Sequence, residues 1–139
     1  MKPADFYRHL EKGSPAPVYL FTGDAELQLE EAWSHILRKM VPEKARRFNG
    51  ERFRAKEVPA LQILSILETL PMFGTRRLVL VQHIEDWAKD QQKLLLAYLQ
   101  KPVATACLVL TLGNTKGFEK VETAVETSGV VVKFAPLTE

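Results

Sequence analysis

The residues around Gly23 form the first segment of this sequence that could bind a charged ligand. The apolar run Val18–Thr22 ends at Gly23, and a helical pattern follows it. In α/β proteins such a junction often binds phosphate, because backbone N–H groups and the helix N-terminus attract anions. A working phosphate loop reads GxxxxGK[ST], in which the lysine neutralises phosphate charge and the hydroxyl ligates magnesium. The chemistry to test is therefore nucleotide binding and phosphoryl transfer.

The charged residues of that loop are missing here. Where the pattern has its second glycine, its lysine and its hydroxyl, the sequence has Gln28, Leu29 and Glu30. Asp24 and Glu26 add negative charge, and each would repel a phosphate by about 1–4 kcal/mol at contact distance. Stabilisation of the helix N-terminus, by about 0.3–1 kcal/mol each, is their simpler role. We therefore predict no nucleotide and no other cofactor at this loop.

The apolar run Leu78–Val81 should end in carboxylates if the protein hydrolysed nucleotides. It continues instead into Gln82 and His83, and neither side chain is a carboxylate. Glu85 and Asp86 follow in the next turn, where capping of the next helix explains them more simply. We favour no role for His83 as a catalytic base, and no serine or cysteine nucleophile arrangement is visible. The sequence therefore predicts a protein that is not itself an enzyme.

A second candidate site is the connector, which we define as residues 70–75. Pro71 stops the preceding helix, and Gly74 permits a turn. Between them stand Met72 and Phe73, in a segment expected to run over the surface. The two side chains either fold back onto the edge of the core or enter a pocket of a partner, and composition leaves both open. Burial of both in a partner would contribute roughly 3–6 kcal/mol before association costs.

Arginines and lysines add little to the prediction. Arg76 and Arg77 could rim the connector or pair with the end of the sheet, and we favour a solvated surface role for them. The formal net charge is +2, which is too weak a balance to indicate nucleic acid. A solvated face is therefore preferred over a DNA-binding stripe for the loose basic group, which consists of Lys44, Arg46, Arg47, Arg52, Arg54 and Lys56.

Apolar runs and helical patterns alternate along the chain, which predicts an α/β fold. Three continuous apolar runs are typical of parallel strands that helices cover on both faces. We therefore predict a five-stranded, mostly parallel sheet flanked by helices. The predicted strands are Val18–Thr22, Ala45–Phe48, Arg77–Val81, Cys107–Leu112 and Gly129–Phe134, with a polar turn at Asn49–Gly50. The predicted helices are Pro3–Glu11, Asp24–Met40, one from about Lys56 to Thr69, and two more around Leu95 and Val121.

Composition narrows the class of protein further. At 139 residues, with 46% hydrophobic and 26% charged residues, the chain fits one globular domain over residues 1–139. The single cysteine, Cys107, rules out an internal disulfide, and the three histidines show no metal-ligand spacing. No apolar stretch approaches the roughly 20 residues needed to span a membrane, and the charged N-terminus lacks a signal-peptide pattern. We expect no membrane contact and a cytoplasmic location.

Several segments, in their order and spacing, resemble one known family. They are Met1–Phe6, Ala16–Asp24, Glu30–Ala32, Leu70–Val81, Cys107–Leu110 and Val130–Leu137. Together they extend over nearly the whole chain and resemble the DNA polymerase III delta subunit of bacterial clamp loaders. The resemblance implies an N-terminal AAA+-like domain, related to P-loop NTPases, that has lost its functional nucleotide site.

The resemblance also implies a function in DNA replication. Leu70, Pro71, Met72 and Phe73 would bind a hydrophobic pocket of the ring-shaped sliding clamp and help to open the ring for loading onto DNA. Other clamp-loader subunits would be bound through lid and collar domains that this chain lacks, and DNA would be met indirectly, within the full complex. The chain would be a noncatalytic subunit of the DNA polymerase III holoenzyme. An active P-loop ATPase and a generic DNA-repair or replication interaction module remain the alternatives.

Overall fold

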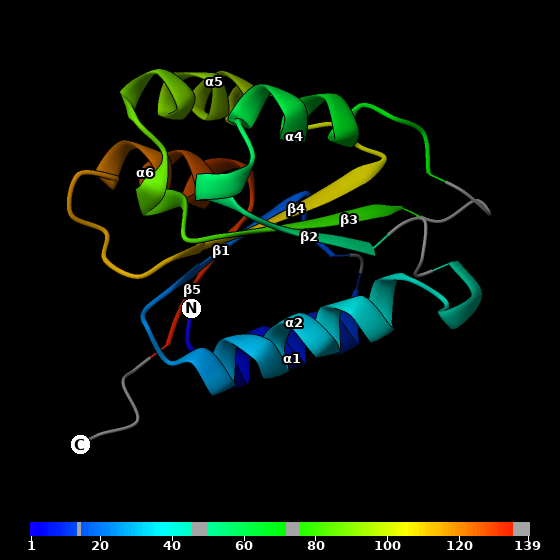
Figure 1. The fold of residues 1–139 in the computed structure, drawn as a ribbon. Helices are drawn as coiled ribbons and strands as arrows, with labels where there is room; N and C mark the ends of the chain where they lie inside the picture. The colour runs from blue at the N-terminus through cyan, green and yellow to red at the C-terminus, as the bar shows by residue number, and fades with distance from the viewer. Residues whose placement is uncertain (14, 46–49, 72–75, 135–139) are drawn as a thin grey trace.

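The protein is described by a computed structural model that covers residues 1–13, 15–45, 50–71 and 76–134. Its strands form one parallel five-stranded sheet in the order β2-β3-β4-β1-β5 (Figure 1). The predicted fold class is thereby confirmed. The strands are β1 Val18–Thr22, β2 Gly50–Arg54, β3 Arg77–Gln82, β4 Ala106–Leu112 and β5 Val130–Lys133.

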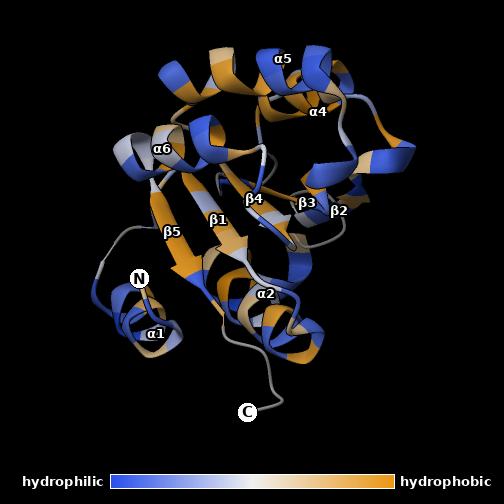
Figure 2. Ribbon diagram, turned by 90° about the vertical axis from the view of Figure 1, so that its left-hand side faces the viewer, coloured by the Kyte–Doolittle hydropathy of each residue, from blue (hydrophilic) through white to orange (hydrophobic). Residues whose placement is uncertain are grey.

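Helices cover both faces of the sheet. Figures 1 and 2 show α1 and α2 on one face and α4, α5 and α6 on the other. The α-helices of the described residues are α1 Pro3–Lys12, α2 Glu26–Met40, α4 Ala60–Leu67, α5 Lys89–Gln100 and α6 Glu119–Ser128. The short 3-10 turns are η1 Glu43–Ala45, η2 Ala55–Glu57 and η4 Ile84–Asp86. Each connection between successive strands contains an α-helix, as is usual where parallel strands pair.

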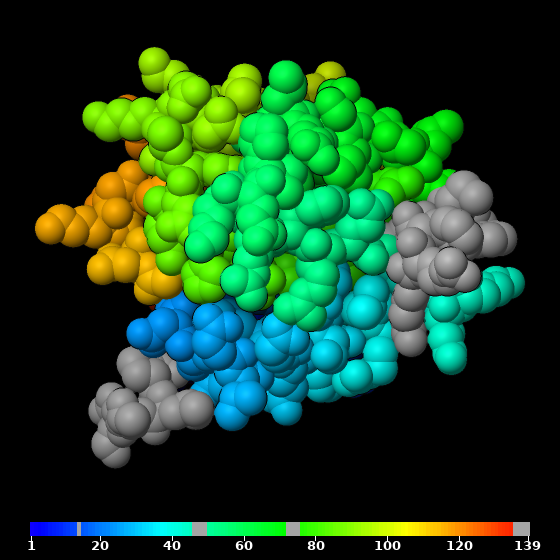
Figure 3. All heavy atoms as spheres, viewed as in Figure 1, coloured from blue at the N-terminus to red at the C-terminus, as the bar shows by residue number. Residues whose placement is uncertain are grey.

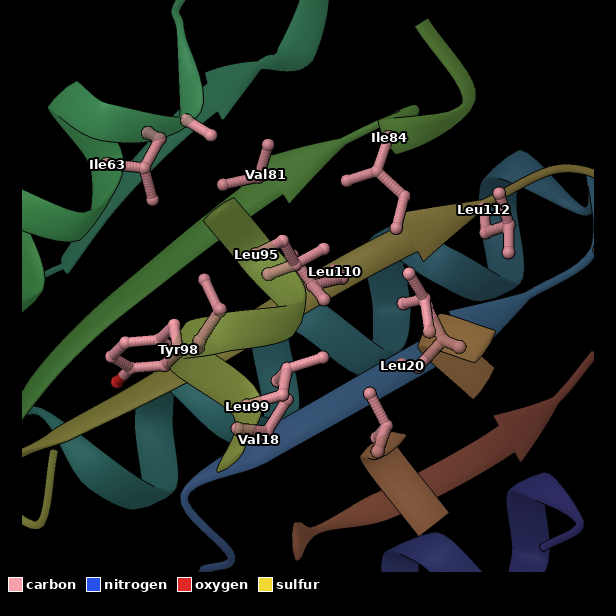
Figure 4. Packing of buried hydrophobic residues seen from close by; sticks show 14 of the residues in the cluster. Val18, Leu20, Ile63, Val81, Ile84, Leu95, Tyr98, Leu99, Leu110 and Leu112 are labelled. Atoms are coloured by element: carbon pink, nitrogen blue, oxygen red, sulfur yellow. The ribbon is translucent and has the colours of Figure 1, made fainter. Parts of the chain in front are cut away.

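The sheet separates two hydrophobic cores. Successive side chains of a strand point to opposite faces, so Leu108 and Leu110 of β4 pack under α4, α5 and α6, as Figure 4 illustrates for Leu110. Cys107 and Val109 pack on the other face, against α1 and α2. Burial raises the pKa of the Cys107 thiol to about 12, which leaves it protonated and unreactive at neutral pH. The strands β1, β3 and β4 are therefore apolar on both faces, as the continuous runs predicted.

The prediction of the second strand was wrong. Ala45, expected to begin it, closes the 3-10 turn η1, and residues 46–48 lie outside the described residues. Gly50, expected in a turn, is the first residue of β2. This strand lies at the edge of the sheet and contributes Phe53 alone to the core face. In Figure 3 the atoms of residues 50–65 form part of the front surface. Charged side chains are common on such edge strands. They interrupt the apolar pattern from which the other strands were predicted, so this strand was not recognised in the sequence.

The helix predicted from about Lys56 to Thr69 is shorter in the structure. Residues 55–57 form a separate 3-10 turn, and α4 extends over Ala60–Leu67. Pro59 causes the break, because a proline pushes the preceding residue into an extended conformation, and Val58 has φ −139° and ψ 127°. The backbone N–H of Ala60 then donates to Oε1 of Gln91 in α5, at 2.6 Å. A side chain from a neighbouring helix therefore caps the start of α4.

We expect Gln91→Ala to lower the free energy of unfolding by about 1–2 kcal/mol, because it removes the acceptor for a half-buried N–H at a helix start. Urea unfolding followed by circular dichroism would measure the change. Gln62→Ala, at an exposed position on α4, is the matched control and should leave the midpoint almost unchanged. Equal midpoints for Gln91→Ala and the parent chain would contradict this capping role.

Candidate functional site

Gly23 lies at the carboxyl end of β1, at the edge of the sheet where a phosphate loop was sought. Its φ is +116°, and a Cβ placed there would lie 2.3 Å from the carbonyl oxygen of Phe134. The backbone N–H of Phe134 donates to the Thr22 carbonyl at 2.9 Å, so the chain after β5 is held against the end of β1. The glycine is therefore required by close backbone packing, and no phosphate is needed to explain it.

The two positions that would carry the lysine and the hydroxyl have structural roles. Leu29 is buried in the core between α2 and the sheet. Glu30 forms an ion pair with Arg52 of β2, in which both guanidinium Nη atoms donate to the carboxylate. Gln28 is half-buried on the first turn of α2. None of these side chains supplies positive charge to a phosphate.

His83 lies between two carboxylates at the same edge of the sheet. Its Nε2 is 3.5 Å from Oε1 of Glu26, and its Nδ1 is 3.2 Å from Oε2 of Glu85. Its backbone has φ 61° and ψ 57°, a left-handed conformation that is uncommon for a residue with a side chain. The backbone N–H of His83 donates to Oγ1 of Thr111 at 2.8 Å, which holds it against β4. Acidic groups therefore surround the position where nucleotide phosphates would need cations.

The predicted capping role of Glu85 and Asp86 was wrong. Both residues belong to the 3-10 turn η4, and α5 begins beyond them, after Ala88 and without a side-chain cap. Oε1 of Glu85 accepts the backbone N–H of Gly113 at 3.2 Å, which joins the ends of β3 and β4. Among the residues that the structure describes, no group of three or more His, Cys, Asp or Glu side chains is arranged to hold a metal ion.

The connector begins and ends at the opposite, amino edge of the sheet. Leu70, the residue that enters it, is 75% exposed, and Pro71 is half-buried. Met72 and Phe73 lie outside the described residues. The strand that follows, β3, separates this edge from His83 by roughly 16–20 Å. The two regions singled out in the sequence are therefore at the two ends of one strand.

The solvated role predicted for Arg77 was wrong. Arg77 is the first residue of β3 and is 7% exposed. Its Nη1 donates to Oε1 of Glu51 in β2 at 2.6 Å. Its Nε donates to the carbonyl oxygen of Thr69, just beyond the end of α4, at 3.4 Å. The guanidinium thus fills the space between the end of α4 and the sheet, on the side of the core that contains Val79.

Arg76 is also held by the protein, on the other face of the sheet. Its Nη1 donates to the Pro15 carbonyl at 2.8 Å and its Nη2 to the Ala106 carbonyl at 3.0 Å. Its Nε is buried without a partner among the described residues. Nearby, burial raises the pKa of Tyr19, whose hydroxyl accepts the Ala16 N–H at 2.8 Å. The prediction of a solvated Arg76 was therefore wrong as well.

No helix among residues 1–13, 15–45, 50–71 and 76–134 is long and apolar enough to cross a membrane.

The basic group noted in the sequence is divided in the structure. Arg52 is paired with Glu30, and the other described members, Lys44, Arg54 and Lys56, are exposed. Arg46 and Arg47 lie outside the described residues. The described part of the group therefore forms no stripe of unpaired cations along one element.

Known proteins resemble this chain in both sequence and fold. The family model of the DNA polymerase III delta subunit matches residues 19–135. A curated relative, DNA polymerase III subunit delta of Bacillus subtilis, is 32% identical over 114 residues. The solved Bacillus subtilis DNA clamp loader delta protein superposes with a TM-score of 0.85 at 26% identity, over 95% of this chain. A Thermotoga maritima DNA polymerase III gamma subunit-related protein has a TM-score of 0.66 at 18% identity over 97% of the chain, which shows the fold alone.

These matches cover only part of each relative. The alignments take in 76% of this chain and 33% of the curated relative, 42% of the solved delta protein and 46% of the Thermotoga protein. The chain thus spans between a third and a half of the proteins that it resembles. Because the family model nevertheless matches residues 19–135, which are most of the sequence, the chain belongs to the DNA polymerase III delta subunit family.

Proposed function

We propose that residues 1–139 are the N-terminal, AAA+-like domain of a clamp-loader delta subunit, and that this domain binds the sliding clamp in DNA replication. The observation that carries the proposal is the contrast between the two edges of the sheet. The carboxyl edge holds Glu26, His83 and Glu85 where phosphates would bind. The amino edge presents the exposed Leu70 at the entrance to a Pro-Met-Phe-Gly connector. This contrast favours a binding module over an enzyme.

The proposed contact is an apolar plug made of Leu70, Pro71, Met72 and Phe73. Phenylalanine brings a large apolar area, and methionine adapts its shape to an irregular pocket. A few such residues usually contribute most of the binding energy of an interface. A hydrophobic pocket on the clamp is the expected counterpart.

Ring opening places a further requirement on the plug. A ligand shifts an equilibrium only by the difference between its affinities for the two states. The plug therefore assists opening only if it binds the opened clamp more tightly than the closed one. The domain needs no nucleotide chemistry for this step.

The proposal for the other partners starts from the greater length of the relatives. Relatives in the family are two to three times the length of this chain. We propose that contacts with the other clamp-loader subunits are made by lid and collar domains outside residues 1–139. DNA is then reached through the complete complex. Neither Leu29 nor Glu30, buried and ion-paired respectively, favours the alternative of an ATPase.

Two titration calorimetry experiments test the proposal. The 139-residue chain is expected to bind the sliding clamp of its own organism with saturable heat, while ATP with magnesium at millimolar concentration gives none. Repulsion from Glu26 and Glu85 and the absence of a lysine account for the second result. Saturable ATP binding would contradict the noncatalytic role. Failure of the chain to bind the clamp would contradict the clamp contact.

A further inference from the structure

We infer that Arg77 is a positioning residue for clamp binding, because its guanidinium holds the two ends of the connector together. We call Arg77, Glu51 and the Thr69 carbonyl the Arg77 brace. The inference rests on the proposed function, since it concerns the presentation of the same connector to the clamp. It assigns Arg77 a role that acts through the connector and needs no contact with the clamp.

The brace joins the residue before the connector to the strand after it. The backbone N–H of Arg77 donates to the Thr105 carbonyl at 3.0 Å, which fixes Arg77 to the start of β4. From that fixed point its Nε reaches back to the Thr69 carbonyl at 3.4 Å. Thr69 is fixed in turn to α4, through its N–H to the Ile66 carbonyl and its hydroxyl to the Ser65 carbonyl. One side chain therefore links the residue before the connector to the first residue of β3.

Glu51 determines the direction of the Arg77 side chain. A buried guanidinium needs an opposite charge and good hydrogen-bond geometry, and Oε1 of Glu51 accepts from Nη1 at 2.6 Å. The Arg77 side chain is 9% exposed and that of Glu51 is 30% exposed. Glu51 lies two residues from Phe53, so both point to the face of the sheet that α4 covers. The carboxylate therefore keeps the Nε–H aimed at the end of α4.

A structural salt bridge without functional consequence is the alternative reading. The pair Arg52–Glu30 is an example, since it joins β2 to α2 and closes no loop next to the connector. The Arg77 brace differs because it spans the segment proposed to bind. Narrowing the range of loop conformations before binding reduces the ordering cost of association. Binding kinetics can separate the two readings.

The first test compares Arg77→Lys and Glu51→Gln with the parent chain in clamp-binding kinetics, at a temperature where all variants are folded. Lysine keeps the charge but loses the planar fork, and glutamine keeps an acceptor of the same shape. If the brace raises the fraction of binding-competent connectors, its loss lowers the association rate constant, by about tenfold for Arg77→Lys and less for Glu51→Gln. The dissociation rate constant stays within about twofold, because the contacts in the complex are unchanged.

The matched control is Arg52→Lys, which weakens an ion pair of β2, the strand that also contains Glu51, at a place away from the connector. It should leave both rate constants unchanged. An unchanged association rate for Arg77→Lys would overturn the inference, even if that variant were less stable. A faster dissociation with unchanged association would overturn it too, since it would make Arg77 a contact residue.

A second test needs no clamp. Hydrogen exchange in a peptide that covers residues 66–78 is expected to be faster in Arg77→Lys than in the parent chain, with peptides of α1, α2 and α6 unchanged. Equal exchange in that peptide would overturn the brace whatever the clamp does. If the parent chain fails to bind the clamp, the positioning role falls with the proposed function, and the exchange result alone decides whether the brace holds the connector.

Discussion

Replacement of Met72 and Phe73 together by alanine is expected to weaken clamp binding by at least about 100-fold, or about 3 kcal/mol. Phe73→Ala alone should lose more than about tenfold, because an aromatic anchor buried in a pocket is a typical hot spot. The free energy of unfolding should change little, because the proposal places both side chains in a pocket of the clamp and not in the core of the domain. Calorimetric titration of the clamp with each variant measures the loss.

The controls for this experiment are two other exposed leucines. Leu61 on α4 is 62% exposed and Leu27 on α2 is 74% exposed, and neither belongs to the connector. Alanine at either position removes apolar surface of similar size and should leave clamp affinity within about twofold, as is usual for residues outside a hot spot. Equal affinities of the double variant and the parent chain would show that the plug has been assigned to the wrong residues.

The second large effect is expected at Gly23. Gly23→Ala should lower the free energy of unfolding by about 2–4 kcal/mol, because alanine meets both a left-handed backbone and the Phe134 carbonyl. For a chain of this length that corresponds to a fall in Tm of roughly 10 °C. Differential scanning calorimetry would measure it. A stable Gly23→Ala variant would mean that close backbone packing is not what requires glycine here.

Two other glycines separate the causes of this effect. Gly117 has φ +86°, and no atom lies within 4 Å of the place that a Cβ would occupy, so alanine there tests backbone strain alone. Gly129 has φ −161°, but a Cβ would lie 2.0 Å from the Val18 carbonyl oxygen, so alanine there tests the clash alone. We expect a loss of about 1 kcal/mol at Gly117 and a larger one at Gly129.

Much of the fold could be predicted because the central strands are apolar on both faces. The runs that became β1, β3 and β4 need no knowledge of their neighbours to be recognised. The edge strand β2 could not be found in this way, since Phe53 is its one residue that packs against the core and charged side chains flank it in the sequence. An edge strand is defined by its pairing with β3, which the local sequence does not contain.

The candidate site was predictable where the argument needed only residue type. Leu29 and Glu30 cannot do the chemistry of a lysine and a hydroxyl, whatever the fold. The approach of His83 to Glu26 could not be predicted, because the two residues come from elements far apart in the sequence. The connector assignment came from the family resemblance, and the clamp contact remains a prediction.

The two arginines were mispredicted because polarity alone suggested solvent. A signal was present in the sequence, since consecutive residues at the start of a strand covered on both faces must point into opposite layers. Arg76 and Arg77 precede the fully apolar run of β3 directly. Helices or loops cover both faces of the sheet there. Each guanidinium therefore contacts protein groups and not solvent alone.

The opposite orientations of these arginines have a mechanical consequence. A pull on the connector would reach the domain through two anchors, the carbonyls of Pro15 and Ala106 on one side of the sheet and Glu51 on the other. The load would then act along β3, in shear against its hydrogen bonds to both β2 and β4. Shear loads many bonds together, whereas peeling breaks them one after another. The two arginines that follow the connector would thus transmit a force on it to the whole sheet.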